Sequence, residues 1–121
     1  MKLEHSSENL PSFNVQKLLD LLEGDTDAAA SFIEMSEIEI KKQLELLRNN
    51  TNPANNKKLA HKLKGTCSTV GMEKLRAIAY KLESLDEVEF KKANILITVA
   101  ENEFEIVKSV IKKEISHLKT R

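Results

Sequence analysis

A histidine near the middle of this chain has neighbours that suit chemistry on an anionic group. The segment 59–83 reads LAHKLKGTCSTVGMEKLRAIAYKLE. At about 100° per residue around a helix, His61, Lys64 and Gly65 share one side. The apolar residues lie on the other side: Leu59, Leu63 and Cys67. An imidazole in water is largely neutral at pH 7 and has a free ring nitrogen, so this spacing suits a nucleophilic histidine with a cation nearby and room for an approaching group.

The same residues also have ordinary structural interpretations. Many histidines on helix surfaces are only solvated, and a glycine inside a helix costs roughly 1 kcal/mol relative to alanine. Gly65 therefore needs a reason, which is either close approach by a partner or tight packing of a neighbouring helix. Residue types alone leave both explanations open.

A longer pattern around His61 resembles the histidine-containing phosphotransfer (HPt) family. The matching positions are Ala60, His61, Leu63, Lys64, Gly65, Gly71, Leu75, Leu82 and Glu83. The resemblance implies that His61 accepts a phosphoryl group from a receiver-domain aspartate and passes it to another receiver. It also implies response-regulator receiver domains as partners, and it is compatible with a place in a hybrid sensor histidine kinase.

Glu83 is a candidate partner for the imidazole. If the helices before and after Gly71 are antiparallel, His61 and Glu83 lie ten and twelve residues from the turn and hence at similar heights. A carboxylate at that height can accept a hydrogen bond from the ring nitrogen that is not the nucleophile, and so fix the orientation of the ring. An ordinary surface glutamate is the alternative.

Lys64 is the residue that we expect to offset the charge of a phosphoryl group on His61. Ser68, Lys57 and Lys58 are secondary candidates, whose simpler interpretation is that they are solvated side chains. Phosphoryl transfer normally also needs a divalent ion, but the sequence has no carboxylate cluster suited to one near the histidine. The chain should need no cofactor of its own, and the metal should come with the partner receiver.

Nothing in the sequence indicates a nucleotide site. Gly24, Gly65 and Gly71 stand apart, so neither a P-loop nor a GxGxxG pattern occurs. We therefore expect a phosphoryl carrier without kinase activity. One alternative is a helical adaptor that is not phosphorylated. The other is a metal-dependent enzyme using His61 and Glu83, which the lack of an HxxxH or ExxH pair disfavours.

Composition narrows the setting in which the chain works. Nineteen basic and nineteen acidic residues cancel, so we expect no attraction to nucleic acid. The one cysteine, Cys67, fits a reducing compartment. No apolar run approaches the roughly 20 residues that span a bilayer, and the first residues lack the apolar region of a signal peptide. We expect a cytoplasmic protein, or the cytoplasmic domain of a membrane sensor kinase.

Apolar periodicity and few aromatic residues predict an all-α domain. We expect a flexible segment over residues 1–12 and a bundle domain over residues 13–121, built as an antiparallel up-and-down four-helix bundle with a short N-terminal capping helix. The expected helices are Val15 to Leu22, Asp25 or Thr26 to about Arg48, about Pro53 to Ser68, Met72 to about Leu85, and Phe90 to Leu118. Asn14 and Asn52 are the expected N-caps, and Gly24 and Gly71 the expected helix ends.

The core-facing stripes follow from spacings of three and four residues. The predicted core residues are Leu18, Leu19, Leu21 and Leu22; Ala29, Ile33, Ser36, Ile40, Leu44 and Leu47; Met72, Leu75, Ile78, Ala79 and Leu82; and Ala93, Ile97, Ala100, Phe104, Val107, Ile111 and Leu118. Met35 and Ile38 fall outside these stripes, so either the first helix covers them or they contribute to docking. The last helix has a second apolar stripe: Ile95, Val99, Ile106 and Val110. The N-terminal helix, another domain or a second copy of the chain could cover it.

Overall fold

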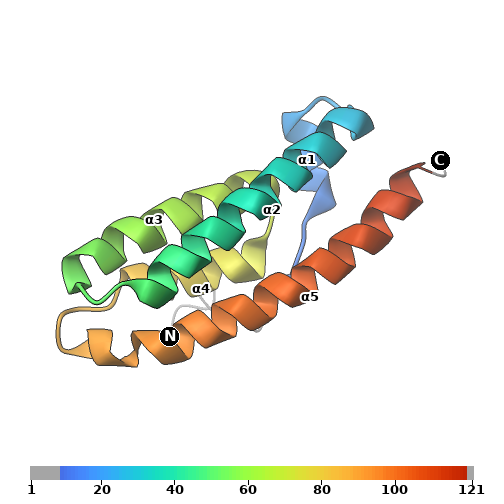
Figure 1. Cartoon of the computed structure of the whole chain (residues 1–121). Helices are drawn as coiled ribbons and strands as arrows, with labels where there is room; N and C mark the ends of the chain where they lie inside the picture. Colours follow the sequence, from blue (N-terminus) through green and yellow to red (C-terminus); the bar gives the residue numbers. More distant parts are fainter. Residues whose placement is uncertain (1–8, 120–121) are drawn as a thin grey trace.

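The structure, a computed structural model, describes residues 9–119 apart from the side chains of Leu118 and Lys119 (Figure 1). This part of the chain is helical. The elements are α1 (Val15–Leu21), α2 (Thr26–Asn49), α3 (Pro53–Val70), α4 (Glu73–Glu83), the 3₁₀ helix η3 (Glu89–Lys92) and α5 (Ala93–Lys119). Residues 1–8 of the segment expected to be flexible lie outside the described residues, as does the side chain of Leu118.

Four of the helices form a closed bundle. Each of α2, α3 and α4 contacts the helix that follows it in the chain, and α5 returns to contact α2. Because the connections are short, successive helices run antiparallel (Figure 1). The short α1 contacts α2 and α3 at one end of the bundle. The predicted up-and-down bundle with an N-terminal capping helix is confirmed.

Side-chain caps explain where α1, α2 and α3 begin. The Oδ1 atom of Asn14 accepts a hydrogen bond from the amide of Lys17 at the start of α1, at 3.2 Å. The Oδ1 atom of Asn52 accepts one from Ala54 at 2.8 Å, and Pro53 occupies the first turn of α3, where its missing N–H costs nothing. Both predicted N-caps are confirmed. Asp25 caps α2 in the same way, so this helix begins at Thr26.

Gly71 ends α3 in a left-handed conformation, with φ at +87°. A segment before α1 crosses this turn: the amide of Asn14 donates to the carbonyl of Gly71 at 2.8 Å, and the amide of Lys74 donates to the carbonyl of Pro11 at 3.1 Å. A Cβ atom on Gly71 would lie only 2.6 Å from the backbone oxygen of Asn14. The turn that joins α3 to α4 is therefore fixed on both sides, and it sets the relative height of the two helices.

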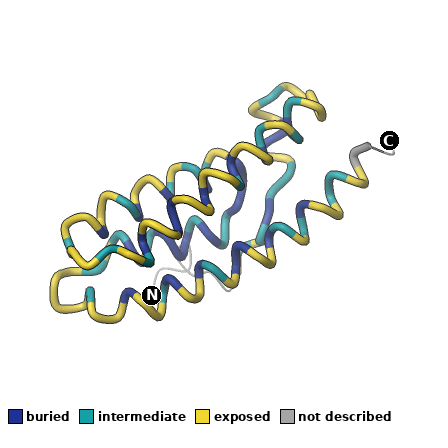
Figure 2. The backbone as a smooth tube through the Cα atoms, in the orientation of Figure 1, coloured by how far each residue is buried: buried dark blue, intermediate teal, exposed yellow. Residues whose placement is uncertain are grey.

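The predicted stripes of α2, α4 and α5 form the core, where their described members are all buried (Figure 2). In α1 the prediction was wrong for Leu21, which is 57% exposed, whereas Leu18 and Leu19 are buried. A helix of seven residues at the end of a bundle is too short for a wide apolar face to be covered. Only the side of α1 that faces α2 and α3 packs.

Some predicted helix ends were also wrong. The third helix continues two residues past Ser68 because the left-handed Gly71, not a polar residue, ends it. The fourth helix ends at Glu83 instead of Leu85. Residues 89–92 form η3 before α5 begins. Asp86 and Glu89 explain this early turn, because each side chain accepts a hydrogen bond from the other's amide, as in a capping box.

Two sets of apolar side chains remain outside the core. Met35 and Ile38 are 71% and 68% exposed, so α1 does not cover them, and that alternative is wrong. On α5, Ile95, Val99 and Ile106 are exposed as well, while Val110 is partly buried against the core. None of the described helices is long and apolar enough to cross a membrane.

Candidate functional site

His61 projects from the middle of α3 into solvent. The apolar face of the helix turns inward, with Ala60, Leu63 and Cys67 fully buried. The imidazole lies opposite this face and is 68% exposed. A partner protein can therefore reach the ring, which is the condition that a nucleophilic histidine must meet.

The structure brings His61 and Glu83 together from two different helices. The Nδ1 atom of His61 lies 2.6 Å from the Oε2 atom of Glu83. The contact spans α3 and α4, whose heights are set by the Gly71 turn, as the count of ten and twelve residues predicts. Glu83 is the last residue of α4 and its side chain is mostly buried.

Lys64 binds the other oxygen of the same carboxylate. Its Nζ atom donates to the Oε1 atom of Glu83 at 2.6 Å and lies 5.5 Å from the centre of the Tyr80 ring. One carboxylate thus holds two side chains of α3 that are one turn apart. The sequence placed Lys64 beside His61 but gave no indication of its bond to Glu83, because a lysine side chain has many rotamers.

The environment of Glu83 keeps this carboxylate charged. Burial raises the pKa of Glu83, but the hydrogen bonds from Lys64 and His61, together with their charges, outweigh it and leave the pKa below its usual value. An ionised carboxylate only accepts hydrogen bonds, so the proton in the contact with His61 belongs to Nδ1. In the neutral ring, Nε2 then has the free lone pair and points away from Glu83.

Gly65 has no packing reason to be glycine. It is exposed, and a Cβ atom built on it would meet no described atom within 4 Å. Tight packing of a neighbouring helix is therefore excluded as the explanation for this residue. Close approach by a partner, the other explanation, stays a prediction.

The remaining candidates near the histidine lie in the core or on the surface and make no contact with the imidazole that the structure records. Cys67 is completely buried, and burial raises the pKa of its thiol well above the usual range, so it is a core residue and not a nucleophile. Lys57 and Lys58 are exposed, and Ser68 is half-buried. In the part of the chain that the structure describes, no group of three His, Cys, Asp or Glu side chains could hold a metal ion.

Sequence reasoning missed two residues at this site. Tyr80 precedes Glu83 by three positions, which places it on the same face of α4, and this spacing could have found it. Asn56 precedes the buried Ala60 by four positions, so it continues the core stripe of α3 and is itself buried. A polar residue inside an apolar stripe was the available signal.

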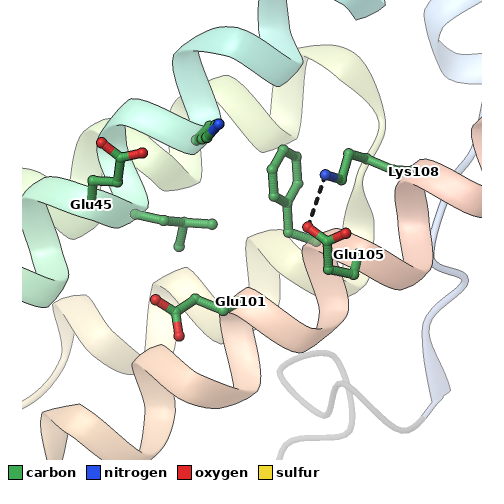
Figure 3. A pocket seen from close by; sticks show the side chains of 7 residues that line it. Glu45, Glu101, Glu105 and Lys108 are labelled. Carbon is green, nitrogen blue, oxygen red and sulfur yellow. Dashed lines mark ion pairs between the residues drawn. The ribbon is translucent and has the colours of Figure 1, made fainter.

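Two surface hollows differ in their relation to the histidine. One of about 500 Å³ lies between the end of α2 and the start of α3, with Leu46, Lys58, Leu59 and Lys62 among its lining residues. Lys58 and Lys62 precede and follow His61 within one turn. The hollow in Figure 3, of about 250 Å³, lies between α2 and α5, and none of its lining residues comes from α3 or α4. Its Lys108 is paired with Glu105.

Comparison with known proteins agrees with the geometry. The model of the Hpt domain family matches residues 27–120, which is more than half of the chain. Comparisons with curated proteins and with solved structures gave no match. A solvent-exposed histidine on the second helix of the bundle, held by a carboxylate from the third, lies within the matched residues. The chain therefore belongs to the Hpt domain family, the histidine phosphotransfer modules of two-component phosphorelays.

Proposed function

We propose that His61 is the phosphoacceptor of a multistep phosphorelay. It takes a phosphoryl group from the aspartyl phosphate of one response-regulator receiver domain and passes it to the aspartate of another. The observation that supports this most is the pairing of an exposed imidazole with Glu83, which leaves Nε2 as the free nitrogen. Glu83 acts by orienting the ring.

The transfer needs no proton to be removed beforehand. The Nε2 lone pair forms a bond to phosphorus as the bond between phosphorus and the aspartate oxygen breaks, and the aspartate leaves as a carboxylate. The ring keeps its proton on Nδ1 and becomes formally cationic, and Glu83, negatively charged and 2.6 Å away, stabilises that charge. The same steps in reverse transfer the phosphoryl group from His61 to the aspartate of a second receiver.

Lys64 offsets the charge of the phosphoryl group once it is on the ring. In the unphosphorylated protein its Nζ atom is bound to Glu83, so the side chain must rotate to reach the new anion. The four-carbon stem of lysine allows that rotation. The divalent ion that the chemistry requires comes with the receiver, and Gly65 leaves room for the receiver's approach.

Docking of the receiver uses the surface beside His61 on the side of α2. The hollow there is lined by the apolar side chains of Leu46 and Leu59 and by two cations, Lys58 and Lys62. Met35 adds exposed apolar surface on α2, and Ile38 does so on the side that faces α5. A partner that presents an apolar side chain next to an anionic group fits this combination.

The test is to incubate the protein with a phosphorylated receiver and to follow the label. We expect acid-labile, alkali-stable label on the wild type and none on His61→Gln. Labelled His61→Gln would overturn the site. A relay that still works in cells with His61→Gln would instead favour the alternative function, an adaptor that is not phosphorylated.

We also propose where in the cell the chain works and that it forms a weak homodimer. The chain works in the cytoplasm, either on its own or as a domain of a hybrid sensor histidine kinase, without kinase activity and without binding nucleic acid.

The exposed stripe of Ile95, Val99 and Ile106 on α5 pairs two copies at high concentration. Sedimentation of wild type and Ile106→Glu checks the homodimer, and a wild type that stays monomeric at every concentration would dismiss it.

A further inference from the structure

We propose that Asn56 is a positioning residue for the phosphoacceptor: it holds the last turn of α4 so that Glu83 stays on the His61 ring. The proposal rests on the function proposed for His61. Asn56 lies in the first half of α3, five residues before the histidine, and it is only 1% exposed. It does not touch the ring, so any effect on His61 has to pass through α4.

The link between the two helices is one hydrogen bond. The Nδ2 atom of Asn56 donates to the carbonyl oxygen of Leu82 at 2.9 Å, and this bond is buried. Leu82 directly precedes Glu83. Asn56 and His61 belong to the same rigid helix, so the bond fixes the backbone next to Glu83 relative to the imidazole.

The end of α4 needs such a bond. The last four carbonyl groups of a helix have no amide partner within the helix, and helix ends fray. Glu83 is the final residue of α4, and besides the bond from Asn56 the carbonyl of Leu82 receives a longer one from the amide of Leu85, at 3.3 Å. Without Asn56, the carbonyl of Leu82 would keep the longer bond from Leu85, while the amide of Ser84 still donates to the carbonyl of Tyr80 at 3.0 Å. The bond from Asn56 therefore adds a tie between α3 and the last turn of α4 that the bonds within α4 do not provide.

Stability alone does not account for an asparagine at this position. The Oδ1 atom of Asn56 is buried and has no hydrogen-bond partner among the described residues. A buried polar atom without a partner is unfavourable, and an apolar residue of similar size would avoid that cost. The amide is therefore better explained by the bond that its other end makes than by a contribution to the core.

The experiment measures which ring nitrogen of His61 carries the proton, by ¹⁵N NMR of the imidazole. In the wild type we expect mainly the form protonated on Nδ1. In Asn56→Ala that form should decrease, and labelling by a phosphorylated receiver should slow roughly tenfold, the low end of the range found when outer-shell hydrogen-bond partners of metal-binding histidines are removed. Asn56→Leu, which keeps about the same size and has no hydrogen-bond donor, should behave in the same way.

Two controls separate positioning from general damage. Asn94→Ala removes an exposed amide near the start of α5 and should leave the tautomer unchanged. In a Glu83→Ala background, Asn56→Ala should have no further effect on the ring, because Asn56 acts only through Glu83. A folded Asn56→Ala with the wild-type tautomer, or an equal effect in both backgrounds, would overturn the proposal.

One measurement needs no substitution. A scalar coupling across the bond between Asn56 Nδ2 and the carbonyl carbon of Leu82 is expected in the wild-type protein, and its absence would also overturn the proposal, even if the variants failed to fold. The tautomer is read without a receiver. If receivers do not label the wild type but Asn56→Ala still shifts the tautomer, the proposed function fails and the positioning role stands.

Discussion

Glu83 holds two side chains of α3 at once, and this sharing defines the unphosphorylated site. Its two oxygens bind the imidazole of His61 and the ammonium of Lys64, each at 2.6 Å. The cation that we propose for the phosphoryl group is thus already paired. On this proposal an incoming phosphoryl group competes with Glu83 for Lys64, while the bond between Glu83 and the ring is kept.

Gly65 offers the most direct test of access to the ring. Gly65→Ala should raise the free energy of unfolding by about 1 kcal/mol, because alanine favours helix and the space for its Cβ is open. Gly65→Leu should slow phosphoryl transfer from a receiver by about tenfold, equivalent to about 1.4 kcal/mol. Stability is measured by urea unfolding and transfer by the rate of labelling.

Labelling by a small donor such as phosphoramidate is the control for the Gly65 variants. It needs no docking, so its rate should be the same in Gly65→Leu and the wild type. Transfer from a receiver at the wild-type rate in Gly65→Leu would show that close approach does not require glycine here.

The pKa of Glu83 predicts a pH dependence of stability. Because this pKa is lower in the folded protein than in the unfolded chain, the charged carboxylate stabilises the fold in full above the ordinary glutamate value of about 4.3. That contribution is lost as the pH falls through the lowered value. Between pH 6 and pH 3, Glu83→Gln should therefore lose less free energy of unfolding than the wild type.

Urea titrations at several pH values check this expectation. Glu87→Gln is the matched control, since Glu87 is exposed and makes no hydrogen bond or ion pair with the other described residues. Equal acid sensitivity in Glu83→Gln and the wild type would contradict the assignment of the lowered pKa to the contacts of Glu83.

The helices show which features of the fold can be predicted from the sequence and which depend on how the helices pack. The stripes of α2, α4 and α5 were predictable because apolar residues that recur every three or four positions indicate the buried face of an amphipathic helix. The exposure of Leu21 was not, since it depends on how little of α1 reaches the bundle. The count of residues from Gly71 did predict the contact between His61 and Glu83. The partner of Lys64 was not predictable because a lysine side chain has many rotamers, and that of Asn56 was not because it is a backbone carbonyl, which no residue type marks.

The glycines at the helix ends give a matched pair for testing the turns. Both Gly24 and Gly71 have positive φ, but only Gly71 is crowded, by the backbone of Asn14. Gly24→Ala should destabilise the protein by about 1 kcal/mol, the penalty of the left-handed conformation. Gly71→Ala should cost more than about 2 kcal/mol, because the clash adds to that penalty.

Thermal and urea unfolding of the two variants measure the difference. Equal losses of stability in Gly24→Ala and Gly71→Ala would mean that the segment before α1 moves aside without an energetic penalty. That segment would then not fix the α3–α4 turn. The site should respond as well: in Gly71→Ala the ¹⁵N signals of the His61 ring are expected to move, whereas in Gly24→Ala they should not.

The charges of the whole molecule cancel, but their distribution is uneven. The helix that carries the histidine, residues 53–70, contains four lysines and no aspartate or glutamate. They surround the imidazole in sequence: Lys57, Lys58, Lys62 and Lys64. An aspartyl phosphate is anionic, so we expect this helix to attract one that approaches His61 although the protein as a whole is neutral.

Salt dependence tests this attraction. The rate of transfer from a phosphorylated receiver should fall as sodium chloride rises from 50 to 500 mM, and Lys58→Glu with Lys62→Glu should slow it by about tenfold at low salt. Lys113→Glu, an exposed charge reversal on α5, should have little effect. Transfer rates that do not change with salt would show that docking depends on shape and apolar contact instead.

The residues to which we assign a role at the imidazole come from a single helical hairpin, α3 and α4. The proposed phosphoacceptor His61 and the proposed roles of Glu83, Lys64 and Asn56 fall between positions 56 and 83. The other helices support this hairpin, and α2 adds exposed apolar side chains to the proposed docking surface. We therefore expect that moving the hairpin onto a different pair of antiparallel helices carries over the chemistry and the lysines of α3, and exchanges only the part of the docking surface that α2 provides.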